Sequence, residues 1–130
     1  MIVVNSIGEL RKVIRQRIKE QGFNCNLNDI DVSRVDDMSS LFTWSKFDGD
    51  ISEWDVSNVK NMNSMFMGSR FSGDISKWDV SKVEDMSSMF AHTSFNGDIS
   101  NWDVSSVENM SWMFSSSKFT GDISRWSVGS

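Results

Sequence analysis

The sequence predicts an α/β solenoid, a coil in which each turn of the chain stacks on the next. Three observations lead to this prediction. A motif recurs with a fixed period of 24 residues. Each copy has an alternating apolar segment followed by an apolar segment with helical spacing. An amphipathic segment precedes the first copy. The chain has 130 residues, the length of about one domain.

The first segment, residues 1–22, is expected to form an amphipathic capping helix. Ser6 and Glu9 fit a capping box at its start, and Gly22 stands where a helix C-cap is expected. Its apolar residues recur with helical spacing at Ile7, Leu10, Ile14 and Ile18. A solenoid needs such a helix to cover its first turn. Five cations line the other side of this segment, so a helix resting on a membrane surface is the alternative interpretation.

The repeats begin at Phe23. Aligned columns run through them, including a tryptophan column made of Trp54, Trp78, Trp102 and Trp126. Four full repeats are predicted, followed by a half repeat: 23–46, 47–70, 71–94, 95–118 and 119–130. In the first copy Cys25, Leu27 and Ile30 replace the Gly, Ile and Trp of the later copies. A period of this length indicates turns that bury their apolar side only by stacking on their neighbours.

Within one repeat the apolar residues change spacing. Ile51, Trp54 and Val56 have the L-x-x-L-x-L spacing that is typical of leucine-rich repeats. We therefore predict a leucine-rich-repeat-like, right-handed solenoid. Each repeat would contain one short parallel strand, around 53–57, and one short Ser-capped helical turn, around 58–66.

The aligned apolar columns are predicted to form the core. Nine Met residues and no Tyr suit a core without polar side-chain ends. We interpret the tryptophan column as core packing rather than as a surface that stacks on carbohydrate, and Cys25 as a small buried apolar residue. Gly73 is expected to supply a turn conformation that other residues avoid.

Two aspartate columns accompany the core. If Trp54 and Val56 point inward, an outward column consists of Asp31, Asp55, Asp79 and Asp103. Stacked turns would hold these carboxylates about 5 Å apart, where like charges repel by about 1 kcal/mol even in water. The carboxylates could cap backbone N–H groups at the following helix start, form a stripe for a cationic partner, or bridge Ca²⁺, although no Asp-x-Asp-x-Asp-Gly pattern is present. A turn-capping role is expected for the second column, Asp50, Asp74, Asp98 and Asp122.

The residue before each repeat tryptophan varies between copies. We call this set the variable column: Glu53, Lys77, Asn101 and Arg125. Positions that differ between copies lie outside the core, so the variable column and the first aspartate column are the predicted partner-binding residues. No catalytic residues, no metal site and no cofactor are expected. The one histidine, His92, has no partner His or Cys column.

Composition restricts the function classes. The net charge is −5 and no basic stripe follows the repeats, so direct binding of nucleic acid is not expected. Residues 1–22 carry a net charge of +3 and residues 23–130 a net charge of −8. One cysteine allows no intrachain disulfide, and no apolar run is long enough for a membrane span. No signal peptide is visible, which predicts a cytoplasmic protein if Met1 is the native start.

The motif F-x-G-D-I-S-x-W-D-V-S-x-V-x-x-M-x-x-M-F covers roughly residues 23–128. It resembles the repeats of BspA-like leucine-rich-repeat surface proteins, which include repeat families of Mycoplasma surface lipoproteins. The resemblance implies a cell-surface or secreted solenoid that binds host proteins or other cells, without catalytic residues.

Two functions compete on this basis. The first is a non-enzymatic protein-binding module that engages a host or cell-surface protein through its strand face. The alternative is an intracellular acidic inhibitor that occupies a basic groove of a nucleic-acid-binding protein. Self-association through the C-terminal edge of the solenoid is a further expectation.

Overall fold

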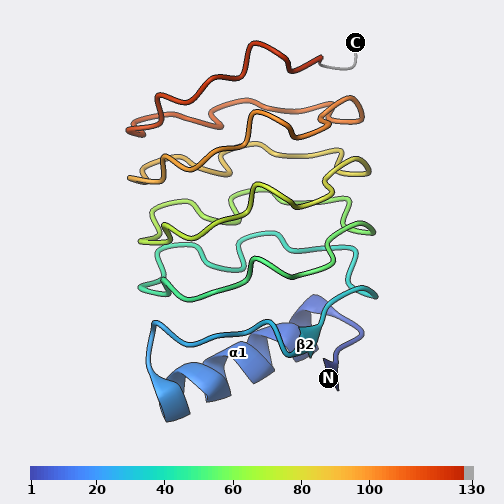
Figure 1. Cartoon of the computed structure of the whole chain (residues 1–130), viewed down its shortest axis with the longest axis vertical. Helices are drawn as coiled ribbons and strands as arrows, with labels where there is room; N and C mark the ends of the chain where they lie inside the picture. Colours follow the sequence, from blue (N-terminus) through green and yellow to red (C-terminus); the bar gives the residue numbers. More distant parts are fainter. Residues whose placement is uncertain (128–130) are drawn as a thin grey trace.

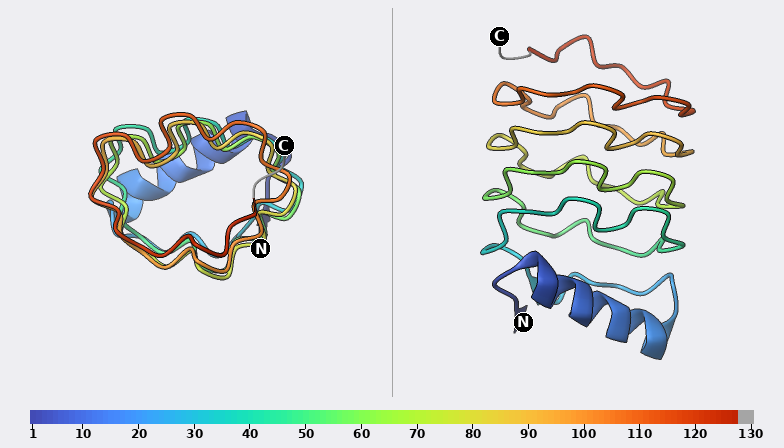
Figure 2. Two further views of the ribbon diagram at one scale, coloured as in Figure 1. Left: turned by 90° about the horizontal axis from the view of Figure 1, so that it is seen from above. Right: turned by 180° about the vertical axis from the view of Figure 1, so that it is seen from behind.

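The computed structural model describes residues 1–127, which form a stack of coils on one helix (Figure 1). Helix α1 lies at the N-terminal end, and each later coil lies on the preceding one. Seen from above, successive coils superimpose on a flattened ring (Figure 2). Parallel bridges join residues one period apart: Asp37–Asn61, Asn61–Asp85 and Asp85–Asn109. One 24-residue period therefore corresponds to one coil.

Helix α1 spans Ile7–Gln21 and is capped at both ends. The Ser6 hydroxyl accepts a hydrogen bond from the Glu9 backbone N–H at 3.2 Å. Gly22 ends the helix with a φ of 90°, a conformation that glycine adopts without strain. The helix therefore begins directly after Ser6 and ends directly before Gly22, the two cap residues that the sequence predicts.

Helix α1 packs its apolar side on the first coil. Leu10 and Ile14 are buried and belong to the same apolar cluster as the coils. Beside the helix, strand β1 (Ile2–Val3) pairs in parallel with strand β2 (Ile30–Asp31). The N-terminal segment thus covers the first coil with a helix and a two-residue strand.

The expected strand at 53–57 and the expected helical turn at 58–66 are not formed. Both segments consist of hydrogen-bonded turns and extended links. The backbone N–H of Trp54, for example, donates to the Ile51 carbonyl at 3.2 Å. Asp and Ser side chains form local hydrogen bonds with the backbone here, and such bonds compete with regular helix and strand pairing.

The segment expected to be helical is instead a ladder between coils. Alternate backbone N–H groups of this segment donate to carbonyls of the next coil at 2.8–3.0 Å. The donor–acceptor pairs are Met62–Asp85, Ser64–Ser87, Phe66–Met89 and Gly68–Ala91. Ser64 and Gly68 have φ angles of 57° and 66°, which a right-handed helix excludes. The same left-handed conformation recurs at Ser40, Trp44, Ser88, His92, Trp112 and Ser116. Every second N–H therefore points to the neighbouring coil.

Two walls enclose the core. We call residues 38–45, 62–69, 86–93 and 110–117 the ladder wall. Residues 26–35, 50–59, 74–83, 98–107 and 122–127 form the turn wall. Phe66 of the ladder wall stacks on Phe90 at 5.7 Å between ring centroids and contacts Trp78 of the turn wall at 6.2 Å. The two walls therefore face each other across a continuous aromatic core.

The tryptophan column belongs to this core, as predicted. Trp54, Trp78 and Trp102 are at most 4% exposed, and Trp126 is half-buried. Each indole N–H donates to a carbonyl of the preceding coil at 2.9–3.1 Å. These bonds satisfy the one polar atom of each buried ring. Cys25 is also buried, as predicted.

Gly73 has a role other than the expected one. Its φ angle is not positive. A Cβ at this position would lie 2.8 Å from the Phe71 ring and 3.2 Å from the Gly49 carbonyl oxygen. Glycine is required because the phenylalanine ring folds over the backbone, rather than because of a special turn conformation.

Candidate functional site

The first aspartate column caps turns of the backbone. Each carboxylate accepts the N–H of the serine two residues later at 3.0 Å, and the serine hydroxyl donates to the same oxygen; the pairs are Asp31–Ser33, Asp55–Ser57, Asp79–Ser81 and Asp103–Ser105. Of the three interpretations, the structure shows the capping role, although a turn rather than a helix follows. The serine cap expected at the start of each helical turn is absent for the same reason; the Ser81 hydroxyl, for example, donates to Asp79 instead.

The same arrangement occurs in two more columns. In the second column the carboxylates accept serine N–H groups at 2.8–3.0 Å, in the pairs Asp50–Ser52, Asp74–Ser76, Asp98–Ser100 and Asp122–Ser124. The third column, which the sequence analysis missed, consists of Asp37, Asn61, Asp85 and Asn109. Its signal in the sequence is an Asp or Asn two residues before a Ser or Asn.

These contacts favour the ionised form of several of the carboxylates. The Ser33, Ser81 and Ser105 hydroxyls, followed by their backbone N–H groups, lower the pKa of Asp31, Asp79 and Asp103, respectively. In the second column the Ser76 backbone N–H is the largest cause that lowers the pKa of Asp74. These four carboxyl groups therefore stay ionised to a lower pH than a free aspartate does.

The variable column is exposed on the same turn wall. Glu53 and Lys77 line a shallow depression of about 60 Å³ together with Ser52 and Asp74. Further along, Arg125 donates to the Asn101 side-chain oxygen at 3.2 Å. The structure thus brings the variable column and the first two aspartate columns onto one wall.

The first coil continues the variable column with Asp29. The Arg17 guanidinium of α1 holds this carboxylate through two hydrogen bonds of 2.9 Å. The hydrogen bond to Arg17 is the largest cause that lowers the pKa of Asp29. Helix α1 is thereby tied to the turn wall by an ion pair as well as by its apolar side.

Two exposed tryptophans on the ladder wall are functional candidates that the sequence analysis missed. Trp44 is 65% exposed and Trp112 is 72% exposed. They are the two of the six tryptophans that do not follow the repeat column, and this irregularity is the signal that could have revealed them. The His92 ring stacks on Trp44, with 6.0 Å between ring centroids. Within residues 1–127, no three His, Cys, Asp or Glu side chains converge as a metal site.

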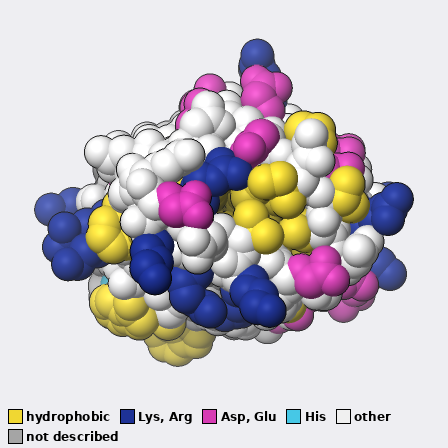
Figure 3. Space-filling view, turned by 90° about the horizontal axis from the view of Figure 1, so that it is seen from below, with side chains coloured by type: hydrophobic (Ala, Val, Ile, Leu, Met, Phe, Trp, Pro, Cys, Tyr) yellow, Lys and Arg dark blue, Asp and Glu magenta, His cyan; other side chains and the backbone are white. Residues whose placement is uncertain are grey.

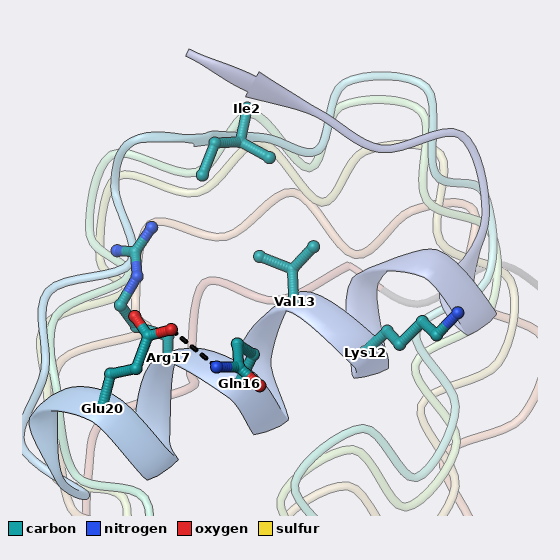
Figure 4. Close-up of a pocket in the computed structure, with 6 residues that line it drawn as sticks. All are labelled: Ile2, Lys12, Val13, Gln16, Arg17 and Glu20. Atoms are coloured by element: carbon teal, nitrogen blue, oxygen red, sulfur yellow. Dashed lines mark hydrogen bonds between the residues drawn. The ribbon is translucent and has the colours of Figure 1, made fainter.

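The end of the stack beneath α1 is a third surface. Lys and Arg side chains gather on it around apolar side chains (Figure 3). A groove of about 500 Å³ lies between β1 and α1, with Ile2 on one side and Val13 on the other (Figure 4). Glu20 also borders the groove, and its carboxylate accepts a hydrogen bond from the Gln16 side chain. The groove is therefore lined by both positive and negative side chains. In the part of the chain that the structure describes, no helix is both long and apolar enough to cross a membrane.

The repeats and α1 are shared with a known protein family. A family profile described as "Mycoplasma protein of unknown function, DUF285" matches residues 8–126. The chain belongs to this family. The match begins within α1 and runs through the coils as far as the last tryptophan of the column, so this family covers both parts of the fold. No curated protein and no solved structure matches the chain.

Proposed function

We propose that this DUF285 chain is a non-enzymatic protein-binding module, related to the BspA-like leucine-rich-repeat surface proteins. Its partner would be a host or cell-surface protein, and the turn wall would be the contact surface. The resemblance of the repeat motif supports this assignment. The stacked coils support it as well, because they form a scaffold on which neighbouring exposed positions lie side by side.

The variable column is the observation that carries the proposal. Core positions and capping positions repeat from coil to coil, whereas the exposed residue before each column tryptophan changes its charge. Going up the stack, the anions Asp29 and Glu53 are followed by the cation Lys77, the neutral Asn101 and the cation Arg125. A partner that matches this order of charges would bind in one register, because like charges oppose each other in any other register.

One observation favours a second candidate function, the acidic inhibitor of a nucleic-acid-binding protein. The capped carboxylates of Asp31, Asp79 and Asp103 stay ionised and form an acidic row. A basic groove would accept such a row. Lys77 and Arg125 of the variable column add positive charge to the same wall, so we prefer the first candidate.

The test exchanges two charges of the variable column. A variant with Glu53→Lys and Lys77→Glu has the net charge of the parent but reverses the order of charges. Both proteins are immobilised and exposed to cell-surface and matrix proteins, and the affinity of each captured protein is then measured. We expect to capture a partner whose affinity for the exchanged variant is at least about tenfold lower than its affinity for the parent.

Two outcomes would contradict this proposal. In the first, the parent and the exchanged variant bind a basic protein with equal affinity, and high salt abolishes this binding. That result would favour the acidic inhibitor. Failure of the parent to capture any cell-surface or matrix protein would remove the first candidate.

A further inference from the structure

The ladder wall differs from the rest of the molecule in its chemistry. The chain contains 13 Lys and Arg and 18 Asp and Glu residues, yet none of them lies in the ladder wall. At its exposed and half-buried positions the wall presents mainly serine side chains, together with Trp44, His92 and Trp112. This is an uncharged, hydroxyl-rich surface with aromatic rings, opposite the charged turn wall.

The two exposed tryptophans occupy strained positions. Trp44 and Trp112 have φ angles of 54° and 62°. The left-handed conformation costs a residue with a side chain about 1–2 kcal/mol. At 65% and 72% exposure, neither ring regains much of this by burial. Other coils have Gly68 at the position of Trp44, and Ser64 and Ser88 at the position of Trp112, so the fold does not require tryptophan there.

The Trp44 ring is held in place although it is exposed. A Cβ at Gly68 would overlap the six-membered ring of Trp44, so the missing side chain of Gly68 makes room for the indole. On the coil after that, the His92 ring stacks on Trp44 at an interplanar angle of 26°. Three successive coils thus fix one aromatic ring and leave most of it open to solvent. A ring fixed in this way loses little conformational entropy when a ligand binds.

Among residues 1–127, the indole N–H groups of the two rings have no hydrogen-bond acceptor. The four column tryptophans donate to backbone carbonyls. Within the described part of the chain, Trp44 and Trp112 make no such bond. Each ring therefore presents an apolar surface and an unused donor, a combination that suits a ligand with both C–H and hydroxyl groups.

We propose that the ladder wall binds a neutral oligosaccharide. The C–H groups on one face of a pyranose ring carry a small positive charge and pack on the negative face of an indole. Sugar hydroxyls would pair with these indole N–H groups and with the exposed and half-buried serine side chains of the wall. The absence of fixed charge matches a ligand without net charge. This surface lies opposite the turn wall and is independent of the protein-binding function proposed above.

The test returns each tryptophan to the residue that other coils carry. Variants Trp44→Gly and Trp112→Ser and the parent are applied to an array of neutral hexose and N-acetylhexosamine oligosaccharides, and titration calorimetry measures the dissociation constant of each sugar that binds. We expect at least about tenfold weaker binding for each variant. We also expect an equal or higher Tm for Trp44→Gly, because glycine relieves the left-handed strain, and an unchanged Tm for Trp112→Ser, because serine occupies the same left-handed position in other coils. A merely structural tryptophan would instead lower the Tm.

A third variant tests how the ring is positioned. Gly68→Ala keeps Trp44 but places a methyl group where the indole lies. We expect weaker sugar binding and greater quenching of the tryptophan fluorescence by acrylamide. Unchanged binding in this variant would show that the position of the ring does not matter and would count against the proposal.

The outcomes separate the two proposals. The Glu53→Lys and Lys77→Glu exchange should leave sugar binding unchanged, since both residues lie on the turn wall. If the parent binds no neutral oligosaccharide, or if Trp44→Gly and Trp112→Ser bind as the parent does, the sugar site is refuted. If Trp44→Gly instead loses the captured protein while no sugar binds, the ladder wall is a protein interface and the sugar proposal is likewise overturned.

Discussion

An aspartate followed two residues later by a serine closes a turn in coil after coil. The Asp79 carboxylate, for instance, accepts the N–H of Ser81 at 3.0 Å and the hydroxyl of the same residue. The oxygen satisfies a backbone donor that no helix or strand uses here. The repulsion between stacked carboxylates is thus opposed by local hydrogen bonds in each coil.

We expect Asp79→Ala to lower the free energy of unfolding by about 1 kcal/mol, because the Ser81 N–H loses its acceptor. Asp79→Asn should have a much smaller effect, since Asn61 and Asn109 make the same bond in the third column. Urea denaturation of the parent and both variants measures the difference. Equal losses for Ala and Asn would show that charge rather than capping matters.

The lowered pKa values predict a loss of stability in acid. The carboxyls of Asp31, Asp79 and Asp103 have a lower pKa folded than unfolded, so they bind protons more readily in the unfolded chain. Their contribution is complete above the unfolded pKa of about 3.9 and is lost as the pH falls through the lower folded value. Urea midpoints at neutral pH and near pH 3 test this. A triple Asp→Asn variant should show a weaker dependence on pH.

Sequence reasoning at the residue scale separated exposed from buried positions better than it assigned roles. It placed Trp54 in the core and Glu53 on the surface, because repetition and variation distinguish the two. It missed Trp44 and Trp112, because a comparison of aligned copies emphasises residues that recur, and these two tryptophans do not recur.

At the element scale, the sequence signals describe α1 well and the coils poorly. Helix caps at Ser6 and Gly22 have distinctive side chains. The segment 62–68 buries Met62, Met65 and Phe66 at the spacing of a helix, although it is a ladder of turns. Four of the eight left-handed positions in the ladder wall hold serine, which gives no sign of positive φ. The Asp-x-Ser pattern was the available warning of local turns.

A matched pair of glycine substitutions tests the element assignments. Gly8→Ala should raise the free energy of unfolding by about 0.5–1 kcal/mol, because Gly8 lies in α1 and a Cβ there meets only the Ser6 hydroxyl at 3.7 Å. Gly49→Ala should destabilise the chain, because its Cβ would overlap the Cys25 carbonyl of the neighbouring coil. Thermal unfolding followed by circular dichroism compares the two. A stabilising Gly49→Ala would mean that the first two coils are not packed as described.

At the scale of the whole molecule, the stack separates two kinds of surface. Aromatic rings of both walls meet in the core, as Phe66 and Trp78 do, so one set of repeated residues supports both outer faces. The turn wall carries charge, and the ladder wall carries hydroxyls and exposed rings. Substitutions on one wall should therefore leave binding on the other unchanged, since the packed core between them stays intact.

The ladder between coils is the feature on which both walls depend, and nuclear magnetic resonance can detect its hydrogen bonds directly. Scalar couplings across hydrogen bonds should connect the amide nitrogens of Met62, Ser64 and Phe66 to the carbonyl carbons of Asp85, Ser87 and Met89, respectively. Couplings to carbonyls four residues earlier in the chain would instead show a helical turn in each repeat and would contradict the two-wall structure.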